Sequence, residues 1–275
     1  MKTNGNLPEI LSREEWLAAR KELLEKEKEL TWARDRLNAD RRRLPTVRMD
    51  KPYTFEGPDG PVDLFEGRLQ LVMHHFMLSP DRDTACPSCS SAADQIGRLR
   101  QLHVRNTTLV AVSRAPYATL AAYRERMGWT FPWYSSYGSD FNYDFHATLD
   151  DRVAPVLLFF RTEGELAEAG TPWTGGPWTE SMRGEEMPGI SAFLRVGDEV
   201  FHTYSAYGRG IEEFHNGNPY LDLTASAARS RGRNRRDAPN HSACRSEGPR
   251  CACPTSTTLN ASLDGDPVNR MSSPE

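Results

Sequence analysis

The 275-residue chain lacks any long apolar stretch. No run approaches the roughly 18 to 20 apolar residues that a membrane-spanning helix requires. Residues 1–11 are polar and have no apolar core of the kind found in secretory signal peptides, so we expect a cytoplasmic protein. The formal net charge of −4 is too small to predict a nucleic acid or a membrane as partner. A glycine-rich phosphate loop and a G-x-S-x-G motif are also missing, and we expect no cofactor.

Cysteine is scarce as well, with five residues in the whole chain. Two of them form a C-x-x-C pair, Cys86 and Cys89, and the other three are Cys244, Cys251 and Cys253. In a reducing compartment these residues are thiols at rest. A close pair in such a compartment more often carries out redox chemistry or binds a metal than forms a structural disulfide.

The N-terminal segment, residues 1–45, predicts one long helix. Ser12 and Glu15 have the spacing of a capping box, and Pro45 marks the end of the helix. A narrow apolar stripe recurs every seven residues, and its members are Trp16, Leu23, Leu30, Leu37 and Leu44. Such a stripe suits a helix packed on the surface of its own domain. It equally suits a homodimer in which two copies of the helix pair.

Residues 46–223 have the pattern of an α/β domain. Apolar runs of strand length alternate with helical patterns, which favours a mixed or parallel sheet flanked by helices. The expected elements are a strand and hairpin at 46–68, a strand at 69–77, a helix at 90–103, a strand at 107–113, a helix at 115–127, and strands at 190–196 and 199–204.

Several segments stand apart from this alternation. Residues 150–187 are interpreted as an insertion, with a candidate strand at 153–160, and a short helix is expected at 209–214. Residues 224–275 contain no aromatic side chain and are rich in Ser, Ala, Arg, Pro and Asn, which is typical of a disordered tail.

The C-x-x-C pair lies between a predicted buried strand and a predicted helix. Cys86 would therefore stand at the N-terminus of the helix, with Pro87 in its first turn. Unpaired N–H groups at that end stabilise a thiolate and lower the pKa of the thiol. We assign Cys86 as the nucleophile and Cys89, one turn later, as the thiol that resolves a mixed disulfide.

Two other interpretations of the pair stay open. Zinc sites use the same spacing, and His74 and His75 are the nearest further ligands. Successive strand residues point to opposite faces, so only one of these two histidines could readily turn toward the cysteines. The pair could also be two inert buried thiols. A structural zinc site normally needs four ligands, which favours redox chemistry, and we expect no metal.

A series of stretches, in order along the chain, resembles a known family. They are LPEILSREEWLAARKELLEKEKELTWARDRLNADRRRLP, HHFMLSPDRDTACPSCSSAAD, LVAVSRAP, YRERMGWTFPWYSSYGSDFNYDF, MPGISAFLR and VFHTYSAYGRG. They span about residues 7–223 and resemble the DUF899 thioredoxin-like family of bacterial proteins. The resemblance implies a thioredoxin-like fold and dithiol-disulfide oxidoreductase activity.

The stretch from LVAVSRAP to WTFPWYSS is also similar to the corresponding part of peroxiredoxins, which implies a peroxiredoxin-like variant of the fold. The peroxidase pattern P-x-x-x-T-x-x-C is not met, because only one residue separates Thr84 from Cys86. Direct reduction of peroxides is therefore not expected.

Thioredoxin-like folds place a cis-proline before the strand opposite the cysteine pair. Pro188, preceded by Met187, stands just before the predicted strand at 190–196. We expect these two residues to position the substrate, because a cis bond exposes backbone groups that can pair with a peptide. An ordinary loop proline is the alternative.

Four further residues are candidate accessory groups. Arg114 follows a predicted strand, where α/β folds often place functional side chains, although a salt bridge explains it equally well. Thr84 comes from the incomplete peroxidase pattern, and His74 and His75 are candidate acid–base groups that core packing would also explain.

Residues 129–145 are dense in aromatic side chains, which most often form core and loop packing. Asp140 and Asp144, together with Tyr137 and Tyr143, are a candidate polar site within this segment, although nothing in their spacing requires catalysis.

The sequence thus predicts a thiol-disulfide oxidoreductase. Its expected partners are a disulfide-containing or small thiol substrate and a reductant that the sequence does not identify. The alternatives are a non-enzymatic thioredoxin-like module that associates through its N-terminal helix, and a Cys/His zinc site.

Overall fold

The structure is a computed structural model that describes residues 9–170, 180–208 and 211. The predicted tail at 224–275, with Cys244, Cys251 and Cys253, lies outside the described residues. The same holds for the helix expected at 209–214, of which only Ile211 is described.

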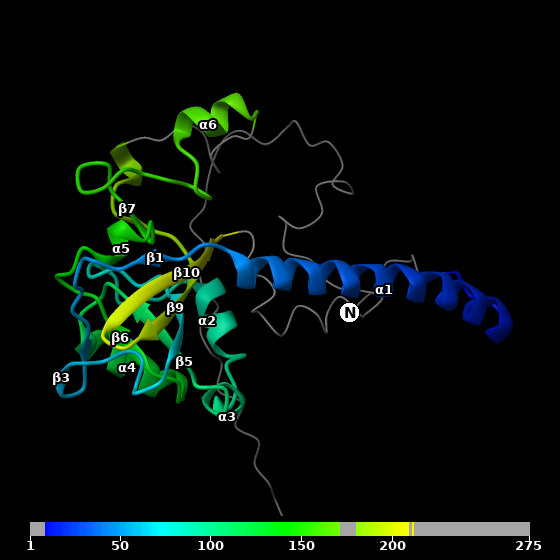
Figure 1. Ribbon diagram of the computed structural model, residues 1–275, viewed down its shortest axis with the longest axis horizontal. Helices are drawn as coiled ribbons and strands as arrows, with labels where there is room; N and C mark the ends of the chain where they lie inside the picture. The colour runs from blue at the N-terminus through cyan, green and yellow to red at the C-terminus, as the bar shows by residue number, and fades with distance from the viewer. Residues whose placement is uncertain (1–8, 171–179, 209–210, 212–275) are drawn as a thin grey trace, which may run out of the picture. The chain divides into compact units, whose positions relative to one another are not determined.

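The predicted N-terminal helix is confirmed as α1, Arg13–Arg43, drawn in blue in Figure 1. The Ser12 hydroxyl accepts a hydrogen bond from the N–H of Glu15 at 3.2 Å. The Glu15 carboxylate accepts one from the N–H of Ser12 at 2.9 Å, so the capping box is present. The helix ends at Leu44, before Pro45. All of α1 is described, and none of its residues is buried.

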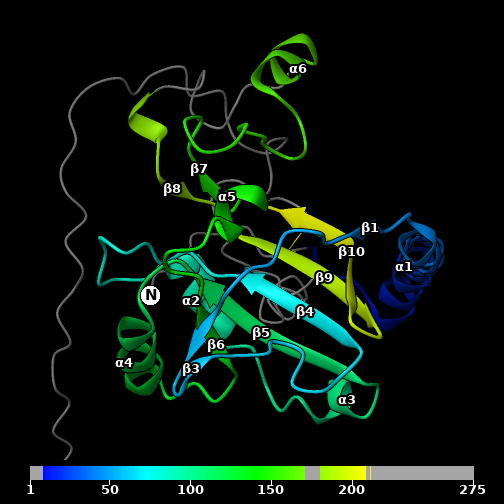
Figure 2. The ribbon, with the colours of Figure 1, turned by 60° about the vertical axis from the view of Figure 1, so that its left-hand side comes forward.

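One mixed sheet of eight strands holds the described part of the chain together. Its strands are β1 (Val47–Arg48), β2 (Glu56–Gly57), β3 (Gly60–Pro61), β4 (Gln70–His75), β5 (Thr107–Ser113), β6 (Trp133–Ser135), β9 (Gly189–Val196) and β10 (Glu199–Tyr207). They are arranged in the order β1-β10-β9-β4-β5-β6-β2-β3. Figure 2 shows β9, β4 and β5 side by side. β4, β5 and β6 are parallel, whereas β9 runs antiparallel to β4 and β10 antiparallel to β9.

Helices connect the parallel strands. The link from β4 to β5 contains α2 (Pro87–Ala93) and α3 (Arg100–His103), and α4 (Tyr117–Met127) links β5 to β6. The single helix expected at 90–103 is therefore wrong. Gly97, a poor helix former, lies between the two short helices, and the Asp94 carboxylate at the end of α2 accepts a hydrogen bond from Trp129 Nε1 at 2.8 Å. Gly128 ends α4 at φ 68°, in the left-handed region that glycine adopts at no steric cost.

The segment between β6 and β9 carries short elements. They are α5 (Phe141–Asp144), β7 (Thr148–Leu149), α6 (Glu163–Glu168), the 3₁₀ helix η1 (Glu180–Met182) and β8 (Glu185–Glu186). β7 and β8 pair antiparallel in a second, two-stranded sheet. The strand expected at 153–160 is wrong, because Phe159 and Phe160 have positive φ values of 51° and 64° that an extended strand cannot accommodate.

Hydrophobic clusters lie on both faces of the sheet. On one face, Phe76, at the end of β4, packs with Cys89 of α2 and Leu120 of α4. On the other face, Leu71 and Met73 of β4 pack with Phe141 and other aromatic rings. Side chains alternate between the faces along a strand, which produces this division. The mixed sheet, its flanking helices and the long N-terminal helix confirm the predicted thioredoxin-like α/β fold.

Candidate active site

The cysteine pair follows the central strand β4 and opens helix α2. Cys86 is the N-cap residue of α2, and Pro87 is the first helical residue. The Cys86 N–H donates to the carbonyl of Met77 at 3.3 Å, and the Cys86 carbonyl accepts from the N–H of Ser90 at 2.9 Å. These bonds fix the backbone of Cys86 between the strand and the helix, as the sequence predicted.

The two thiols differ in their exposure to solvent. Cys89 is only 2% exposed and belongs to the cluster that contains Ala93 and Tyr123. Cys86 is partly buried and packs against the same cluster. Both residues are free thiols. Cys86 is therefore partly open to solvent, whereas Cys89 is covered by the core.

The electrostatic environment separates the two thiols further. A hydrogen bond from the Cys89 thiol lowers the pKa of Cys86 to about 5. Burial opposes this effect, and hydrogen bonds from the backbone N–H groups of Cys89 and Ser88 add to it. The same hydrogen bond raises the pKa of Cys89, and burial and the negative charge of Cys86 raise it further. These opposite shifts favour the thiolate at Cys86 and the protonated thiol at Cys89.

A polar network lies beside the loop that leads to Cys86. Arg114, directly after β5, binds the carboxylate of Glu186 through Nε at 2.9 Å and the hydroxyl of Tyr143 through Nη1 at 2.8 Å. The positive charge of Arg114 also contributes to the lowered pKa of Asp81 in this loop, after the larger effect of a hydrogen bond from Ser79. Arg114 therefore takes part in a partly buried network.

A second ion pair connects the loop to β8. Arg82 Nη2 lies 3.7 Å from the carboxylate of Glu185, the residue before Glu186. Both side chains are largely exposed, so this contact is weak. It nevertheless places the loop before Cys86 beside the strand that precedes Met187 and Pro188.

The expected cis-proline is absent. All peptide bonds among the described residues, including Met187–Pro188, are trans. The Met187 N–H donates to the carbonyl of Ala147 at 2.8 Å, and the Pro188 carbonyl accepts from the N–H of Gly208 at 2.9 Å. A trans bond carries the chain from β8 into β9 while both hydrogen bonds are kept. Pro188 does precede β9, as predicted, but without the bond geometry expected for it.

The two histidines point to opposite faces of β4, as the sequence predicted. His74 contacts the ring of Phe76, with centroids 5.7 Å apart. His75 Nε2 lies 2.7 Å from the Ser191 hydroxyl on β9, and its ring stacks on Phe141 at 5.8 Å. His75 thus belongs to the core on the face opposite the cysteines. Within the ranges that the structure describes, no three His, Cys, Asp or Glu side chains gather as metal ligands.

Thr84 is exposed and close to Cys86 in the sequence, and its hydroxyl donates to the carboxylate of Asp83 at 3.1 Å. Asp140 and Asp144 do share a polar site, because both bind Lys51 Nζ, at 2.9 and 2.7 Å. Tyr143 points elsewhere and binds Arg114.

Sequence reasoning missed two residues of these networks, Glu186 and Lys51. Glu186 is 9% exposed although it stands in a polar stretch, and its burial comes from the pairing of β8 with β7. Lys51 binds Asp140 and Asp144, which lie 89 and 93 positions later in the sequence. Nothing in the local sequence signals either contact.

The fold and the site together define a protein of the thioredoxin-like class with a C-x-x-C dithiol at the start of a helix. The model of one family, described as "Bacterial protein of unknown function (DUF899)", matches residues 5–246. The chain belongs to this family, which confirms the resemblance seen in the sequence.

Solved structures that resemble the chain include bacterial peroxiredoxins. A cysteine-to-serine mutant of PrxQ from Xylella fastidiosa is 14% identical, with a TM-score of 0.38, and the match covers 65% of this chain and 96% of that one. The bacterioferritin comigratory protein of Xanthomonas campestris is 11% identical, with a TM-score of 0.36, over 62% of this chain and 87% of that one. A search of curated proteins finds no match.

Proposed function

We propose that the chain is a thiol-disulfide oxidoreductase in which Cys86 attacks and Cys89 resolves. The observation that carries this proposal is the asymmetry of the two thiols. Cys86 is partly accessible and has a lowered pKa, whereas Cys89 is buried and has a raised pKa. A zinc site or a pair of inert thiols does not require this difference.

The first step is attack of the Cys86 thiolate on one sulfur of a substrate disulfide. A bond forms between that sulfur and Cys86, the substrate S–S bond breaks, and the other substrate sulfur leaves as a thiolate. Because Cys86 is already ionised at neutral pH, this step needs no separate base.

The second step depends on a change in the pKa of Cys89. Two of the three effects that raise this pKa come from Cys86, through its hydrogen bond and its charge. Both disappear once Cys86 is part of a mixed disulfide, so the pKa of Cys89 falls. The Cys89 thiol then loses its proton to solvent and its thiolate attacks the Cys86 sulfur, which releases the second substrate thiolate. The resulting Cys86–Cys89 disulfide is returned to the dithiol by an external thiol reductant.

Met187 and Pro188 are proposed to position the substrate. The Arg82–Glu185 pair brings the loop of the dithiol beside the strand that leads to these residues. Arg114 is proposed to hold that strand in place through Glu186. Since the cycle starts from free thiols, the proposal also places the protein in a reducing compartment, the cytoplasm.

The test is insulin reduction with dithiothreitol as the reductant. A Cys244→Ser/Cys251→Ser/Cys253→Ser variant serves as the parent, so that all thiol chemistry reports on Cys86 and Cys89. In this parent, Cys86→Ser should abolish the catalysed rate. Cys89→Ser should accumulate a mixed disulfide with the substrate, which mass spectrometry of the intact protein detects.

A matched control is Ser88→Ala, which changes the intervening sequence and keeps both thiols. This variant should retain most of the rate, because the Ser88 side chain makes the smallest of the contributions that lower the pKa of Cys86. A Cys86→Ser variant that is as active as its parent would refute the proposal. Equal thiol reactivity of Cys86 and Cys89 toward a small disulfide would contradict it as well.

A second candidate function is self-association through α1, favoured by one observation. The apolar stripe of α1 is exposed, with Trp16 at 52%, Leu30 at 64% and Leu37 at 46%. Two copies of the helix could bury these stripes against each other. Light scattering should then give a dimer for the wild type and a monomer for Leu30→Glu. Trp32→Glu, at an equally exposed position off the stripe, should leave the dimer intact.

A further inference from the structure

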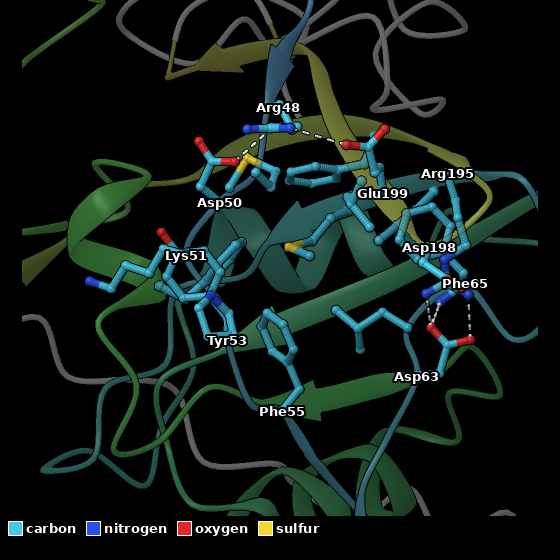
Figure 3. Close-up of a pocket in the computed structure, with 18 of the residues that line it drawn as sticks. Arg48, Asp50, Lys51, Tyr53, Phe55, Asp63, Phe65, Arg195, Asp198 and Glu199 are labelled. Carbon is cyan, nitrogen blue, oxygen red and sulfur yellow. Dashed lines mark hydrogen bonds and ion pairs between the residues drawn. The ribbon is translucent and has the colours of Figure 1, made fainter.

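A cavity of about 550 Å³ lies on the face of the sheet opposite the dithiol. Figure 3 shows residues that line it. Leu71 and Met73 of β4 and Phe193 of β9 line it, together with Phe55 and Phe141. Leu71 and Met73 belong to the hydrophobic cluster of that face, whereas Cys86 and Cys89 belong to the cluster of the other. The cavity is therefore separate from the active site proposed above.

The apolar lining of the cavity is rich in aromatic rings. Tyr53 and Phe55 meet Phe141 edge to face, with ring centroids 5.2 and 4.9 Å apart. Two thioethers, Met49 and Met73, add polarizable surface that contacts aromatic rings favourably. The volume lies within the range of about 300 to 1,000 Å³ that is typical of small-molecule sites. The lining is thus suited to the ring system of a small aromatic compound.

The cations at the cavity are already held by carboxylates, as the dashed lines in Figure 3 show for two of them. Arg48 pairs with Asp50 at 2.8 Å and with Glu199 at 3.2 Å, and Arg195 pairs with Asp63 at 2.6 Å. The third lining cation, Lys51, is bound by two carboxylates. An anionic ligand would have to displace one of these pairs.

The lining disfavours an anionic ligand. Its four carboxylates, Asp50, Asp63, Asp198 and Glu199, outnumber its three cations, which repels an anion. The faces of two lining rings already carry cations of the chain: Lys51 lies over the ring of Tyr53 at 5.6 Å, and Arg195 lies over that of Phe65 at 4.1 Å.

We propose that this cavity binds an uncharged aromatic small molecule of one or two rings. The rings would contact Phe55, Phe141 and Phe193, and the paired ions at the cavity would exclude anionic analogues. This binding is independent of the dithiol, so the failure of either proposal leaves the other standing.

The test uses two fluorescent probes that share one ring system. N-phenyl-1-naphthylamine is uncharged, and 8-anilino-1-naphthalenesulfonate carries the same rings with a sulfonate. Titration of the full chain with the uncharged probe should saturate at one molecule per chain with a blue-shifted emission. The sulfonate should bind at least ten-fold more weakly. Equal affinity for the two probes, or no saturable binding of the uncharged one, would overturn the proposal.

Variants assign the binding to this cavity. Val200 lines the cavity and is partly buried, so Val200→Trp should fill it and weaken binding of the uncharged probe at least ten-fold. Val196 is 56% exposed and is absent from the lining, so Val196→Trp should leave the affinity within two-fold of wild type. Circular dichroism checks the fold. If Val200→Trp does not fold, Met49→Trp takes its place. Unchanged affinity in a folded variant that carries either tryptophan would refute the assignment of the binding site to this cavity.

Discussion

Arg114 Nε lies 2.9 Å from a carboxylate oxygen of Glu186, and this ion pair joins the end of β5 to the end of β8. The Glu186 side chain is 8% exposed, and its second oxygen accepts a hydrogen bond from the Thr148 hydroxyl at 3.0 Å. Burial raises the pKa of Glu186, while the charge of Arg114 opposes that rise. The carboxylate therefore depends on its partner to stay ionised in the interior.

Removing one partner of this pair should destabilise the fold strongly. Arg114→Leu leaves the Glu186 carboxylate buried without its cation, and breaking a buried pair in this way costs about 3 kcal/mol or more. Arg114→Leu/Glu186→Leu should cost less than Arg114→Leu alone, because it removes both charges. The free energy of unfolding in urea measures both effects.

The control for this comparison is an exposed ion pair. Arg43 and Asp40 lie 2.6 Å apart with side chains 70% and 67% exposed. Asp40→Asn should change the free energy of unfolding by less than about 1 kcal/mol, since solvent screens such pairs. A cost for Arg114→Leu as small as that of Asp40→Asn would show that Glu186 is not held as described.

Much of the fold could be predicted because its signals are local. The capping box of Ser12 and Glu15, the apolar run at 107–113 and the Gly197-Asp198 turn each fix an element from neighbouring residues. The errors fall where local signals compete with tertiary contacts. The helix at 90–103 breaks near Gly97, and the strand expected at 153–160 fails at Phe159 and Phe160.

The candidate site likewise has one part that local sequence predicts and another part that depends on tertiary contacts. The order of Cys86, Pro87 and Cys89 before a helix is a local pattern, and the structure places them as that pattern predicts. The Arg114–Glu186 pair spans 72 positions, and the trans geometry at Pro188 depends on hydrogen bonds to Ala147 and Gly208. Neither follows from periodicity or spacing, because both arise from pairing between distant segments.

Cys86 should react as a thiolate far below neutral pH. Its pKa, lowered to about 5, predicts that alkylation by iodoacetamide becomes half-maximal near pH 5, whereas an unperturbed cysteine requires about pH 8.5. The Cys244→Ser/Cys251→Ser/Cys253→Ser parent isolates this signal. Cys89→Ala in that parent should move the midpoint upward, because alanine cannot donate the side-chain hydrogen bond that lowers the pKa of Cys86 most. An unchanged midpoint would assign the low pKa to the backbone N–H groups instead.

Pro188→Ala should separate substrate positioning from stability. The Met187–Pro188 bond is trans, and alanine keeps the carbonyl that accepts from Gly208, so the free energy of unfolding should change by less than about 1 kcal/mol. If Pro188 positions a peptide substrate, KM for insulin should rise several-fold. The rate with a small aromatic disulfide should stay the same. Equal losses with both substrates would indicate a disturbed dithiol rather than lost positioning.

His75 should make the protein sensitive to acid. Burial, with smaller effects from His74 and His202, lowers the pKa of His75 to about 3 from its ordinary value of 6.5. Between these two values the unfolded chain binds a proton that the folded chain excludes, so stability falls as pH drops below 6.5. From pH 6.5 to pH 5 the loss from this one group is about 2 kcal/mol, by the relation of about 1.4 kcal/mol per pKa unit.

The His75 contribution can be isolated by substitution. His75→Phe keeps a ring against Phe141 and Phe145, and Ser191 retains its hydrogen bond to Ser205 at 2.7 Å. Between pH 5 and 6.5 the unfolding free energy of His75→Phe should depend on pH less steeply than that of wild type. The difference in slope should correspond to about one bound proton. The matched control is His103→Phe, at a partly exposed position at the end of α3, and the slope lost in His75→Phe should exceed the slope lost in this control. Parallel curves for wild type and His75→Phe would contradict the prediction, because they would mean that His75 binds a proton as readily in the folded as in the unfolded chain.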